Sequence, residues 1–457
     1  MTTMNMKKFI KRTSLLVAAA LISLFAAHNA GSAATIADLT DIPQKPSAFL
    51  PTNPDDPIVS FVDQLVYAED FMTSFFAPWG ENDLSYLDLS MDQIIKFHQA
   101  TAKSQLFKSD GKLMPKSDLT AIADNGKLTP DLTSRPGIIV THSDVRVLPS
   151  ANPLYPSAAS ALGKRGLLKQ DVLQNSTLKP GEPVAVFAQS KDGNWYFVAS
   201  GTVVGWVPQK NVAFVDITVM ERYLYNEYAV FIRDNVRLTG ADGAFITIAK
   251  MGTVMPLEGT QVILPVRGKN GFAELAALQP EQGIVSNFPL PFTARNAAQA
   301  LEQVIGEPYA WGGLQGHRDC SAMTMDYFAL FGVRLPRNSG DQAMLGASIP
   351  LKNLSKGERI AAIVERGIPF ATLIHMPGHI MLYLGTYNGK PVVIHNVWGV
   401  RILLADGQKG RAVIGKTAIT TLEAGLELKN RQTNSLFIDN VGKLVFPMAG
   451  INYDIID

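Results

Sequence analysis

The chain has 457 residues, which is long for one domain, and it combines 47% hydrophobic residues with 37 glycines and 27 prolines. These values indicate about two to four compact domains with many turns. The formal net charge is +1, which does not indicate a protein that binds a polyanion, so we expect no nucleic-acid partner.

The first 34 residues have the pattern of an export signal. Basic residues between Lys7 and Arg12 precede the apolar run 15–27, and residues 32–34 (Ser-Ala-Ala) offer a small-residue cleavage site. We therefore expect residues 1–34 to be a signal peptide and the exported chain to act in the periplasm, or outside the cell in the wall. A buried core helix is the alternative for this run. No later apolar run reaches about 18 residues, so we expect no membrane span after signal removal.

Residues 35–130 are expected to form a mainly helical N-terminal segment. The proline-rich stretch 41–57 predicts an extended connector. Apolar residues then recur at helical spacing from Ser60, with a break predicted at Pro78-Trp79, and a second helix is predicted over 90–103. We expect this segment to stabilise the packing of the other domains rather than to bind substrate.

Two regions of short alternating strands follow, at residues 131–217 and 218–288. The first has predicted hairpin turns at Asp192-Gly193 and Ser200-Gly201, and the second is a weaker copy of it. The NWYFV and GWVP segments of the first region resemble bacterial SH3-like barrels, so each region is expected to be one small β-barrel. We expect Trp195 and Trp206 in the barrel core, with stacking on sugar or peptide as the alternative.

The only cysteine, Cys320, follows a glycine-rich loop and opens a predicted helix. Apolar residues recur at i, i+4, i+7 and i+8 from Met323, and Gly332 is the expected stop. The N–H groups and the positive dipole end at a helix N-terminus favour the thiolate, which is the nucleophilic form. A lone cysteine in an exported protein is buried and inert, paired with another molecule, or kept for its thiol chemistry. The residues around Cys320 favour the last of these.

Two histidines on predicted neighbouring strands supply the other groups that a thiol nucleophile needs. His379 begins the alternating run HIMLYL, from which its imidazole can face Cys320, and His395 lies on the next strand, after a turn at residues 387–389. We predict that His379 is the base and that His395 orients it through a hydrogen bond. His317 is close to Cys320 along the chain and His375 lies outside the inward alternation, so neither is expected to be the base.

These segments together resemble the NlpC family of bacterial cell-wall cysteine endopeptidases. The resemblance rests on YAWGG, DCS at a helix start, LPRNS, GHIMLYLG and the later histidine, in the family's order, and it covers roughly residues 297–446. It implies a multidomain α+β protein in which a papain-like NlpC catalytic domain, residues 289–457, follows the two SH3-like barrels and the helical segment. It also implies cleavage of the bond between γ-D-glutamate and a diamino acid in peptidoglycan stem peptides. Cys320 is then the nucleophile, His379 the base and His395 the third residue, and Tyr309 resembles the family tyrosine whose hydroxyl lies near the nucleophile.

The candidates for substrate binding are Asp319, Ser321, Ser339 and Tyr155. The resemblance implies that Asp319, together with the Ser321 hydroxyl, pairs with the α-ammonium of the substrate. Capping of the predicted helix is the alternative for Asp319, and both roles can hold. In the subgroup of the family with this domain order, the first barrel limits substrates to peptides with a free N-terminal L-Ala, and Tyr155 is a candidate for that wall.

The segment PRNSGDQ carries three further expectations. In the same subgroup the serine of the PRxS motif, Ser339 here, reaches the substrate. Ser339 and Gln342 also form the S-x-x-Q pattern of a capping box, and capping is the expected role for Gln342. Arg337 is expected to pair with a carboxylate of the protein or of the ligand.

Two other functions stay open on the sequence alone. Cys320, His379 and His395 could ligate zinc with water completing the site, as in a zinc hydrolase, although the DCS and YAWGG motifs have no role there. Alternatively the protein is a wall-binding scaffold with an inactive enzyme domain, which the intact Cys/His/His set argues against. The thiol mechanism requires no cofactor and no metal. The sequence does not distinguish diaminopimelate from lysine as the diamino acid.

Overall fold

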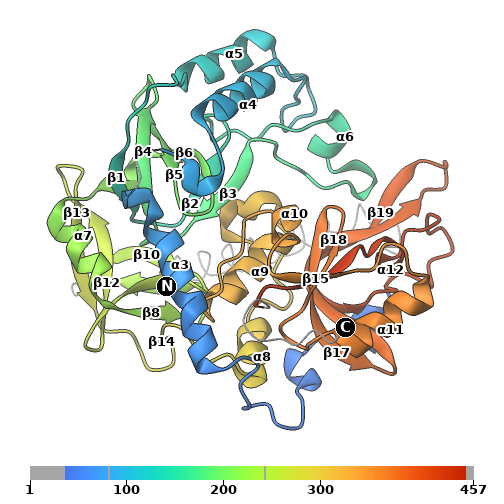
Figure 1. The fold of residues 1–457 in the computed structure, drawn as a ribbon. Coiled ribbons are helices and arrows are strands. Elements are labelled where there is room, and N and C mark those ends of the chain that lie inside the picture. The colour runs from blue at the N-terminus through green and yellow to red at the C-terminus, as the bar shows by residue number, and fades with distance from the viewer. Residues whose placement is uncertain (1–35, 81–82, 241–242, 449–457) are drawn as a thin grey trace, which may run out of the picture.

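The computed structural model describes residues 36–80, 83–240 and 243–448, so the predicted signal peptide lies outside the described residues. Figure 1 shows a helical N-terminal segment, two β units and a larger α+β unit packed against one another. Within the described residues, no helix is long and apolar enough to cross a membrane.

The N-terminal segment is mainly helical, as expected. Its longest helix, α3, runs past both β units and the α+β unit (Figure 1). The Gln64 amide donates to the carbonyl oxygens of Leu290 and Phe331 at 2.6 and 3.0 Å, and the Trp79 indole donates to Gly137 O at 2.7 Å. The helix therefore ties the first β unit to the α+β unit. The elements are α2 (Asp38–Asp41), η1 (Pro46–Phe49), α3 (Phe61–Gly80), η2 (Ser85–Leu87), α4 (Met91–Lys103) and α5 (Lys116–Asn125).

Two expectations for this segment were wrong. Helix α3 continues through Pro78 to Gly80, because a proline in the last turn removes only one backbone hydrogen bond and the aromatic rings of Phe76 and Tyr223 pack on Trp79. The stretch 41–57, expected to be an extended connector, is interrupted by the 3-10 helix η1 and is held against the α+β unit. Gln44 forms two hydrogen bonds with the backbone of Ile419, at 2.8 and 3.0 Å, and so covers an edge strand of the α+β unit.

The first β unit is a seven-stranded antiparallel sheet of order β3-β2-β6-β5-β4-β1-β7. Turns follow the expected positions, with Gly193 at a φ of 74° between β4 and β5. Trp206 is fully buried and Trp195 is partly buried, both in the same apolar cluster, so the core role expected for them holds. The elements are β1 (Arg135–Ile139), β2 (Ser143–Arg146), α6 (Ala158–Ala161), η3 (Lys164–Gly166), β3 (Gln174–Leu178), β4 (Pro183–Gln189), β5 (Trp195–Ala199), β6 (Val204–Pro208), η4 (Gln209–Asn211) and β7 (Val212–Phe214).

The second β unit has a five-stranded sheet, β13-β12-β11-β8-β14, and a two-stranded sheet, β10-β9. Its buried core combines Ala229, Phe231, Leu238, Ala249, Met255, Val262 and Leu264, with partly buried valine, leucine and isoleucine residues packed around them. The elements are α7 (Ile217–Leu224), β8 (Glu227–Phe231), β9 (Val236–Thr239), β10 (Phe245–Ala249), β11 (Val254–Glu258), β12 (Gln261–Arg267), β13 (Ala273–Leu278) and β14 (Val285–Asn287).

The α+β unit is built on a six-stranded antiparallel sheet, β15-β20-β16-β17-β18-β19. Ile380, Leu382 and Leu384 of β17 join the apolar cluster of α9, whereas Met381 and Tyr383 join the cluster of α11 and α12 on the other side. Alternate residues of β17 therefore face two different hydrophobic cores, as the alternation in the sequence predicted. The elements are α8 (Ala294–Glu302), η5 (Trp311–Gly316), α9 (Cys320–Ala329), α10 (Ser339–Gln342), β15 (Ala347–Pro350), α11 (Lys356–Arg366), β16 (Leu373–Met376), β17 (His379–Tyr387), β18 (Lys390–Leu403), β19 (Lys409–Thr421), α12 (Phe437–Asn440) and β20 (Lys443–Phe446).

Candidate active site

Cys320 is the first residue of helix α9, and its position is fixed by the residue before it. Asp319 is the N-cap, and its Oδ1 accepts a hydrogen bond from Ala322 N at 2.8 Å. A cap of this kind stabilises a helix by about 1 kcal/mol. Backbone N–H groups of Ser321 and of Ile380, the second residue of β17, are close enough to the thiol to lower its pKa. The thiol therefore lies against the beginning of β17, where His379 stands.

Burial controls the protonation of the thiol more than the helix end does. Cys320 is 7% exposed, and burial raises the pKa of its thiol to about 12, with the Asp319 carboxylate adding to the rise. The N–H groups of Ile380 and Ser321 and the Arg337 guanidinium lower that pKa but do not outweigh burial. The expectation that the position at a helix N-terminus activates Cys320 is therefore incomplete.

The two histidines expected to act with Cys320 form a hydrogen-bonded chain. His379 Nε2 lies 2.9 Å from His395 Nδ1, and His395 Nε2 lies 3.0 Å from Thr420 Oγ1. His395 is fully buried and packs edge-on against Phe437, with ring centroids 5.1 Å apart. Burial lowers the pKa of His379 to about 4, an effect that Asp319 partly offsets, and it lowers the pKa of His395 further below its ordinary value. Both imidazoles are therefore neutral in this arrangement.

The hydrogen bond between the histidines bears on the zinc alternative. The two facing nitrogens share one hydrogen, so their lone pairs do not both point to a common metal position. Among the residues that the structure describes, no three His, Cys, Asp or Glu side chains are placed to hold a metal ion. The geometry supports a thiol site rather than the zinc site.

Asp319 and Arg337 form a buried ion pair beside the nucleophile. Arg337 Nη2 donates to Asp319 Oδ2 at 2.7 Å and Nη1 donates to Oδ1 at 3.1 Å, and a further bond from Arg337 Nε reaches Ser176 Oγ of β3 at 2.7 Å. The carboxylate also accepts hydrogen bonds from Gly312 N and the Ser321 hydroxyl. With the capping bond it accepts from five donors, which fills a carboxylate's acceptor positions. The capping role expected for Asp319 and the carboxylate partner expected for Arg337 are both present.

The loop before Cys320 approaches the first β unit closely enough to require glycine. Gly312 has a φ of 64°, and a Cβ there would lie 2.7 Å from Gln174 Cγ and 2.9 Å from Gln174 O. Gln174 Nε2 donates to Gly312 O at 3.1 Å. Strand β3 therefore contacts both the YAWGG loop and, through Ser176, the Asp319–Arg337 pair.

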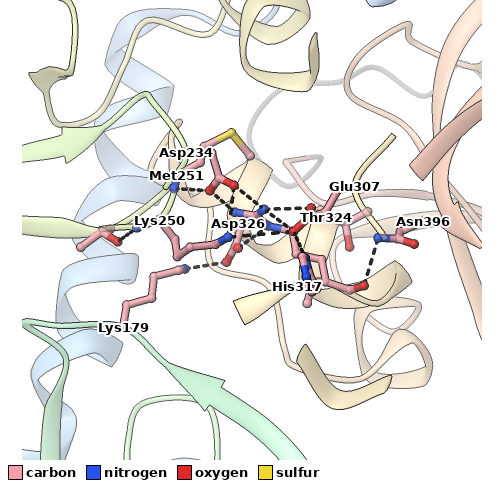
Figure 2. Close-up of polar contacts among 12 residues, drawn as sticks. Lys179, Asp234, Lys250, Met251, Glu307, His317, Thr324, Asp326 and Asn396 are labelled. Carbon is pink, nitrogen blue, oxygen red and sulfur yellow. Dashed lines mark hydrogen bonds and ion pairs between the residues drawn. The ribbon is translucent and has the colours of Figure 1, made fainter. Parts of the chain in front are cut away.

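A buried cluster of charges holds the segment just before the nucleophile (Figure 2). Arg318 is 1% exposed and pairs with Asp326, Asp234 and Glu307, at 2.7, 2.7 and 3.0 Å. Lys250 pairs with Asp234 at 3.2 Å. Burial would raise the pKa of Asp234, but Arg318 and Lys250 lower it below its usual range.

The charge cluster joins three parts of the chain. Lys179, from the first β unit, pairs with Asp326 of α9 at 2.5 Å, and Asp234 and Lys250 come from the second β unit (Figure 2). The Arg318 carbonyl accepts hydrogen bonds from Ala310 N at 2.9 Å and from Asn396 Nδ2 at 3.0 Å. Packing of both β units is therefore linked to the backbone two residues before Cys320.

A cleft of about 1170 Å³ opens beside His379. Tyr309, Trp311 and Trp398 line it from the α+β unit, and the segment 156–170 of the first β unit lines it from the other side. The Trp398 indole donates to Gly166 O at 2.7 Å, which holds the two walls together. Proximity to Cys320 and Asp319, after burial, raises the pKa of Tyr309 above its ordinary value, so its hydroxyl stays protonated.

Comparison with known proteins agrees with this architecture. Residues 306–402 match the NlpC/P60 family, 169–208 and 216–261 match SH3 domains of the SH3b1 and SH3b2 types, and 14–129 match the N-terminal stabilising domain of NlpC/P60 proteins. The chain is 30% identical over 206 residues to the peptidoglycan endopeptidase RipB of Mycobacterium tuberculosis, an alignment that spans 38% of this chain and 73% of that protein. The chain belongs to the NlpC/P60 family. It is thus a member of a family of cysteine peptidases, and the expected α+β fold with two SH3-like domains is confirmed.

Two further similarities cover more of this NlpC/P60 chain. It is 26% identical over 226 residues, 48% of its length, to the gamma-D-glutamyl-L-lysine dipeptidyl-peptidase of Bacillus subtilis, 72% of which is covered. The structure of an NlpC/P60 endopeptidase from Photobacterium damselae subsp. piscicida superposes with a TM-score of 0.80 over 89% of this chain and 98% of that chain, at 23% identity. That likeness extends the fold assignment to all the described domains.

Some residues expected at the NlpC/P60 site lie elsewhere. Ser339 is the first residue of α10 and Asn338 is the N-cap, without a side-chain capping bond, so the predicted capping box is wrong. Gln342 instead lies fully buried, donating to the carbonyl oxygens of Ser321 and Pro336 and accepting from the Thr324 hydroxyl. This bridge ties α10 to α9.

Tyr155 and the two other histidines are also outside the cleft lining. The backbone of Tyr155 pairs with Phe107, and its side chain is 8% exposed, whereas the adjacent Pro156 lines the cleft. His317 lies in the loop next to Glu307, with its Nδ1 3.7 Å from Oε1. His375 lies on β16 across from Ile380 and is half-buried. Neither histidine is bonded to Cys320, His379 or His395.

Three contributors to the site were missed by the sequence analysis: Ser176, Gln174 and Thr420. Thr420 is fully buried on β19 and Ser176 lies on β3. Each reaches the site through strand pairing or domain packing, which no local motif records. A hydroxyl side chain on the strand that pairs with the strand of His395 could have indicated Thr420 as a hydrogen-bond partner of that histidine.

Proposed function

We propose that the protein is a cysteine peptidase that cleaves the bond between γ-D-glutamate and the diamino acid of peptidoglycan stem peptides. The observation that carries the proposal is the hydrogen-bonded series His379, His395 and Thr420, whose first member lines the cleft, together with Cys320 at the start of α9. The relatives named above act, by their names, on peptidoglycan or on γ-D-glutamyl-L-lysine. The protein is proposed to be exported, because its substrate lies outside the cytoplasm.

The hydrogen-bond chain supports one tautomer for each histidine. If His379 Nδ1 is to accept the proton of Cys320, its Nε2 carries hydrogen and donates to His395 Nδ1. His395 then carries hydrogen on Nε2 and donates to the Thr420 hydroxyl. This order leaves no buried imidazole N–H without an acceptor.

The reaction begins with a proton transfer from the Cys320 thiol to His379 Nδ1. Burial disfavours a thiolate or an imidazolium alone, but one transfer forms both charges side by side, and the N–H groups of Ser321 and Ile380 stabilise the sulfur. The sulfur attacks the γ-carbonyl carbon of D-glutamate, and N–H groups at the start of α9, with Tyr309, stabilise the oxyanion.

Collapse of the tetrahedral intermediate breaks the C–N bond. Protonated His379 donates its Nδ1 proton to the leaving amine of the diamino acid, which leaves a thioester on Cys320. Neutral His379 then takes a proton from water, hydroxide adds to the thioester carbonyl, and the proton returns to the sulfur as the acyl group leaves. No cofactor takes part.

A free N-terminal L-Ala on the substrate is part of the proposal. Strand β3, which contacts Gly312 and, through Ser176, the Asp319–Arg337 pair, is proposed to close the end of the site that receives the N-terminal side of the substrate. Asp319 and Ser321 are the proposed contacts for the ammonium, although Arg337 already neutralises the carboxylate, so the ammonium has to share Asp319 with it. Ser339 and Tyr155 are proposed only as outer contributors, since neither lines the cleft.

A matched peptide assay tests the proposal. The substrates are L-Ala-γ-D-Glu-diaminopimelate and the same peptide with an acetylated α-amine. Wild type is expected to cleave only the free peptide, and Cys320→Ala and His379→Gln are expected to lower kcat/KM by at least about 10³-fold. His317→Gln is the matched histidine control and is expected to stay within about threefold of wild type.

Each alternative result has a defined meaning. Equal cleavage of both peptides would remove the amine requirement but keep the peptidase. No cleavage by wild type, combined with binding of Cys320→Ala to purified sacculi, would replace the peptidase with the scaffold function. Activity that a chelator abolishes and stoichiometric zinc restores would replace the thiol mechanism.

A further inference from the structure

The cleft beside His379 has an unusual charge composition. Arg401 and Arg411 line it, and none of its lining residues is an aspartate or a glutamate. The remaining lining is aromatic, aliphatic or neutral polar, apart from His379 itself. A cleft with two guanidinium groups and no carboxylate attracts an anionic ligand.

The two arginines are held side by side by strand register. Arg401 of β18 is the direct cross-strand partner of Arg411 of β19. Like charges placed opposite each other destabilise an antiparallel pair, and burial, with a further contribution from Arg401, lowers the pKa of Arg411. In the described part of the chain, neither guanidinium has an ion pair or a side-chain hydrogen bond. An anion bound between the two guanidinium groups would relieve this repulsion.

Among the residues that the structure describes, the walls around this pair add no aspartate or glutamate. Arg165 of η3 donates to Gln408 at the hairpin end, and Gly166 O holds Trp398. Asp406 in the same hairpin accepts from Gln408 N and is exposed, outside the cleft lining. The arginine pair is therefore free to meet a ligand.

We infer that Arg401 and Arg411 bind the side-chain carboxylate of the leaving diamino acid, so that the enzyme selects diaminopimelate over lysine, whose side chain carries no carboxylate. The inference rests on the proposed function. His379 gives its proton to the leaving amine and lines the same cleft, so the diamino acid occupies the space that the arginines face. Lysine would place an ammonium there without a carboxylate to pair with the guanidinium groups.

The test compares three peptides that differ only beyond the scissile bond: L-Ala-γ-D-Glu followed by diaminopimelate, by diaminopimelate amidated at the side-chain carboxylate, or by lysine. Wild type is expected to cleave the first with a kcat/KM at least tenfold above the other two. In Arg401→Gln, Arg411→Gln and the double variant, the kcat/KM for the diaminopimelate peptide is expected to be less than threefold above that for the other two peptides. The main cause is expected to be a higher KM for the diaminopimelate peptide. Lys409→Gln, an exposed charge on the same hairpin outside the cleft lining, is expected to keep the wild-type ratio.

The outcomes separate this inference from the proposed function. An unchanged rate on the lysine peptide shows that a variant is folded and active, and the conservative Arg401→Lys and Arg411→Lys variants serve if the glutamine variants unfold. Equal wild-type rates on the three peptides, or a ratio that survives the double substitution, would overturn the inference while leaving the peptidase intact. A peptide carrying D-isoglutamine in place of D-glutamate adds one more arm. If the arginine substitutions alter only the difference in rate between the D-glutamate and D-isoglutamine peptides, the two arginines bind the α-carboxylate of the glutamyl residue, and the inference is wrong. Failure of wild type on all peptides would instead refute the proposed function.

Discussion

Replacing Arg318 with methionine tests whether the buried charge cluster holds the domains together. The cluster has three cations, Lys179, Lys250 and Arg318, and three carboxylates, Asp234, Glu307 and Asp326. Arg318→Met leaves two cations against three carboxylates in a site where every side chain is at most 12% exposed. Removing one partner of a buried ion pair costs about 3–5 kcal/mol, and we expect a loss of that size in the free energy of unfolding.

The assay is chemical denaturation followed by tryptophan fluorescence and far-UV circular dichroism, with midpoints compared at equal slope. Arg222→Met is the matched control, because the Arg222–Glu258 pair has a similar distance, 2.7 Å, but side chains that are 45% and 38% exposed. Exposed pairs contribute about 0–1 kcal/mol. Adding Asp234→Asn to Arg318→Met restores equal numbers of charges and is expected to recover part of the loss.

The peptidase activity should report the same perturbation. The Arg318 carbonyl is bonded to Ala310 and Asn396, so we expect kcat to fall in Arg318→Met at denaturant concentrations where the chain is still folded. A loss no larger than that of Arg222→Met, or a double variant less stable than the single one, would refute the assignment of the cluster as a structural link.

Three further predictions concern buried hydrogen bonds and protonation. Thr420→Val removes the hydrogen-bond acceptor of His395 and is expected to lower kcat about tenfold with KM unchanged. Thr420→Ser keeps the hydroxyl and is expected to retain activity. A kcat that the valine substitution does not change would show that this hydrogen bond does not orient the base. Gln342→Leu removes the buried hydrogen bonds to the carbonyl oxygens of Pro336 and Ser321 and from the Thr324 hydroxyl, and it is expected to lower the unfolding free energy by about 1–3 kcal/mol, measured by denaturation. Burial lowers the pKa of His98 to about 4, so the unfolded chain binds more protons between about pH 6.5 and 4, and stability falls as pH falls through that window. The shift corresponds to about 3 kcal/mol, so wild type should lose about that much relative to His98→Phe between pH 7 and 4, and parallel pH profiles would contradict the assignment.

The sequence was sufficient where a local pattern carries the structure. Cys320 at a helix start and His379 at a strand start follow from the periods of their own segments, and the hairpin turn at Asp192-Gly193 follows from glycine at a positive φ. It was insufficient where a residue's role depends on a distant partner. The S-x-x-Q pattern predicted a cap at Ser339, yet tertiary packing draws Gln342 into the core between α9 and α10.

The charge cluster shows the same limit at larger scale. Its six members come from three domains, and the segments that hold Asp234 and Arg318 are 84 residues apart in the chain. No spacing rule connects them. Individually each looks like an ordinary surface charge, and only the fold shows that they neutralise one another in a buried site.

The Asp319–Arg337 pair resolves a conflict that the sequence raised. A carboxylate next to a nucleophilic thiol opposes the thiolate, and Asp319 does raise the pKa of Cys320. The same carboxylate is needed to cap α9 and to hold the Gly312 backbone. Arg337 lowers the pKa of Cys320 and pairs with both oxygens of Asp319, so the helix keeps its cap while much of the unfavourable charge is neutralised. Because Arg337 is itself bonded to Ser176 of the first SH3-like domain, that domain contributes to the electrostatics of the nucleophile as well as to the wall of the cleft.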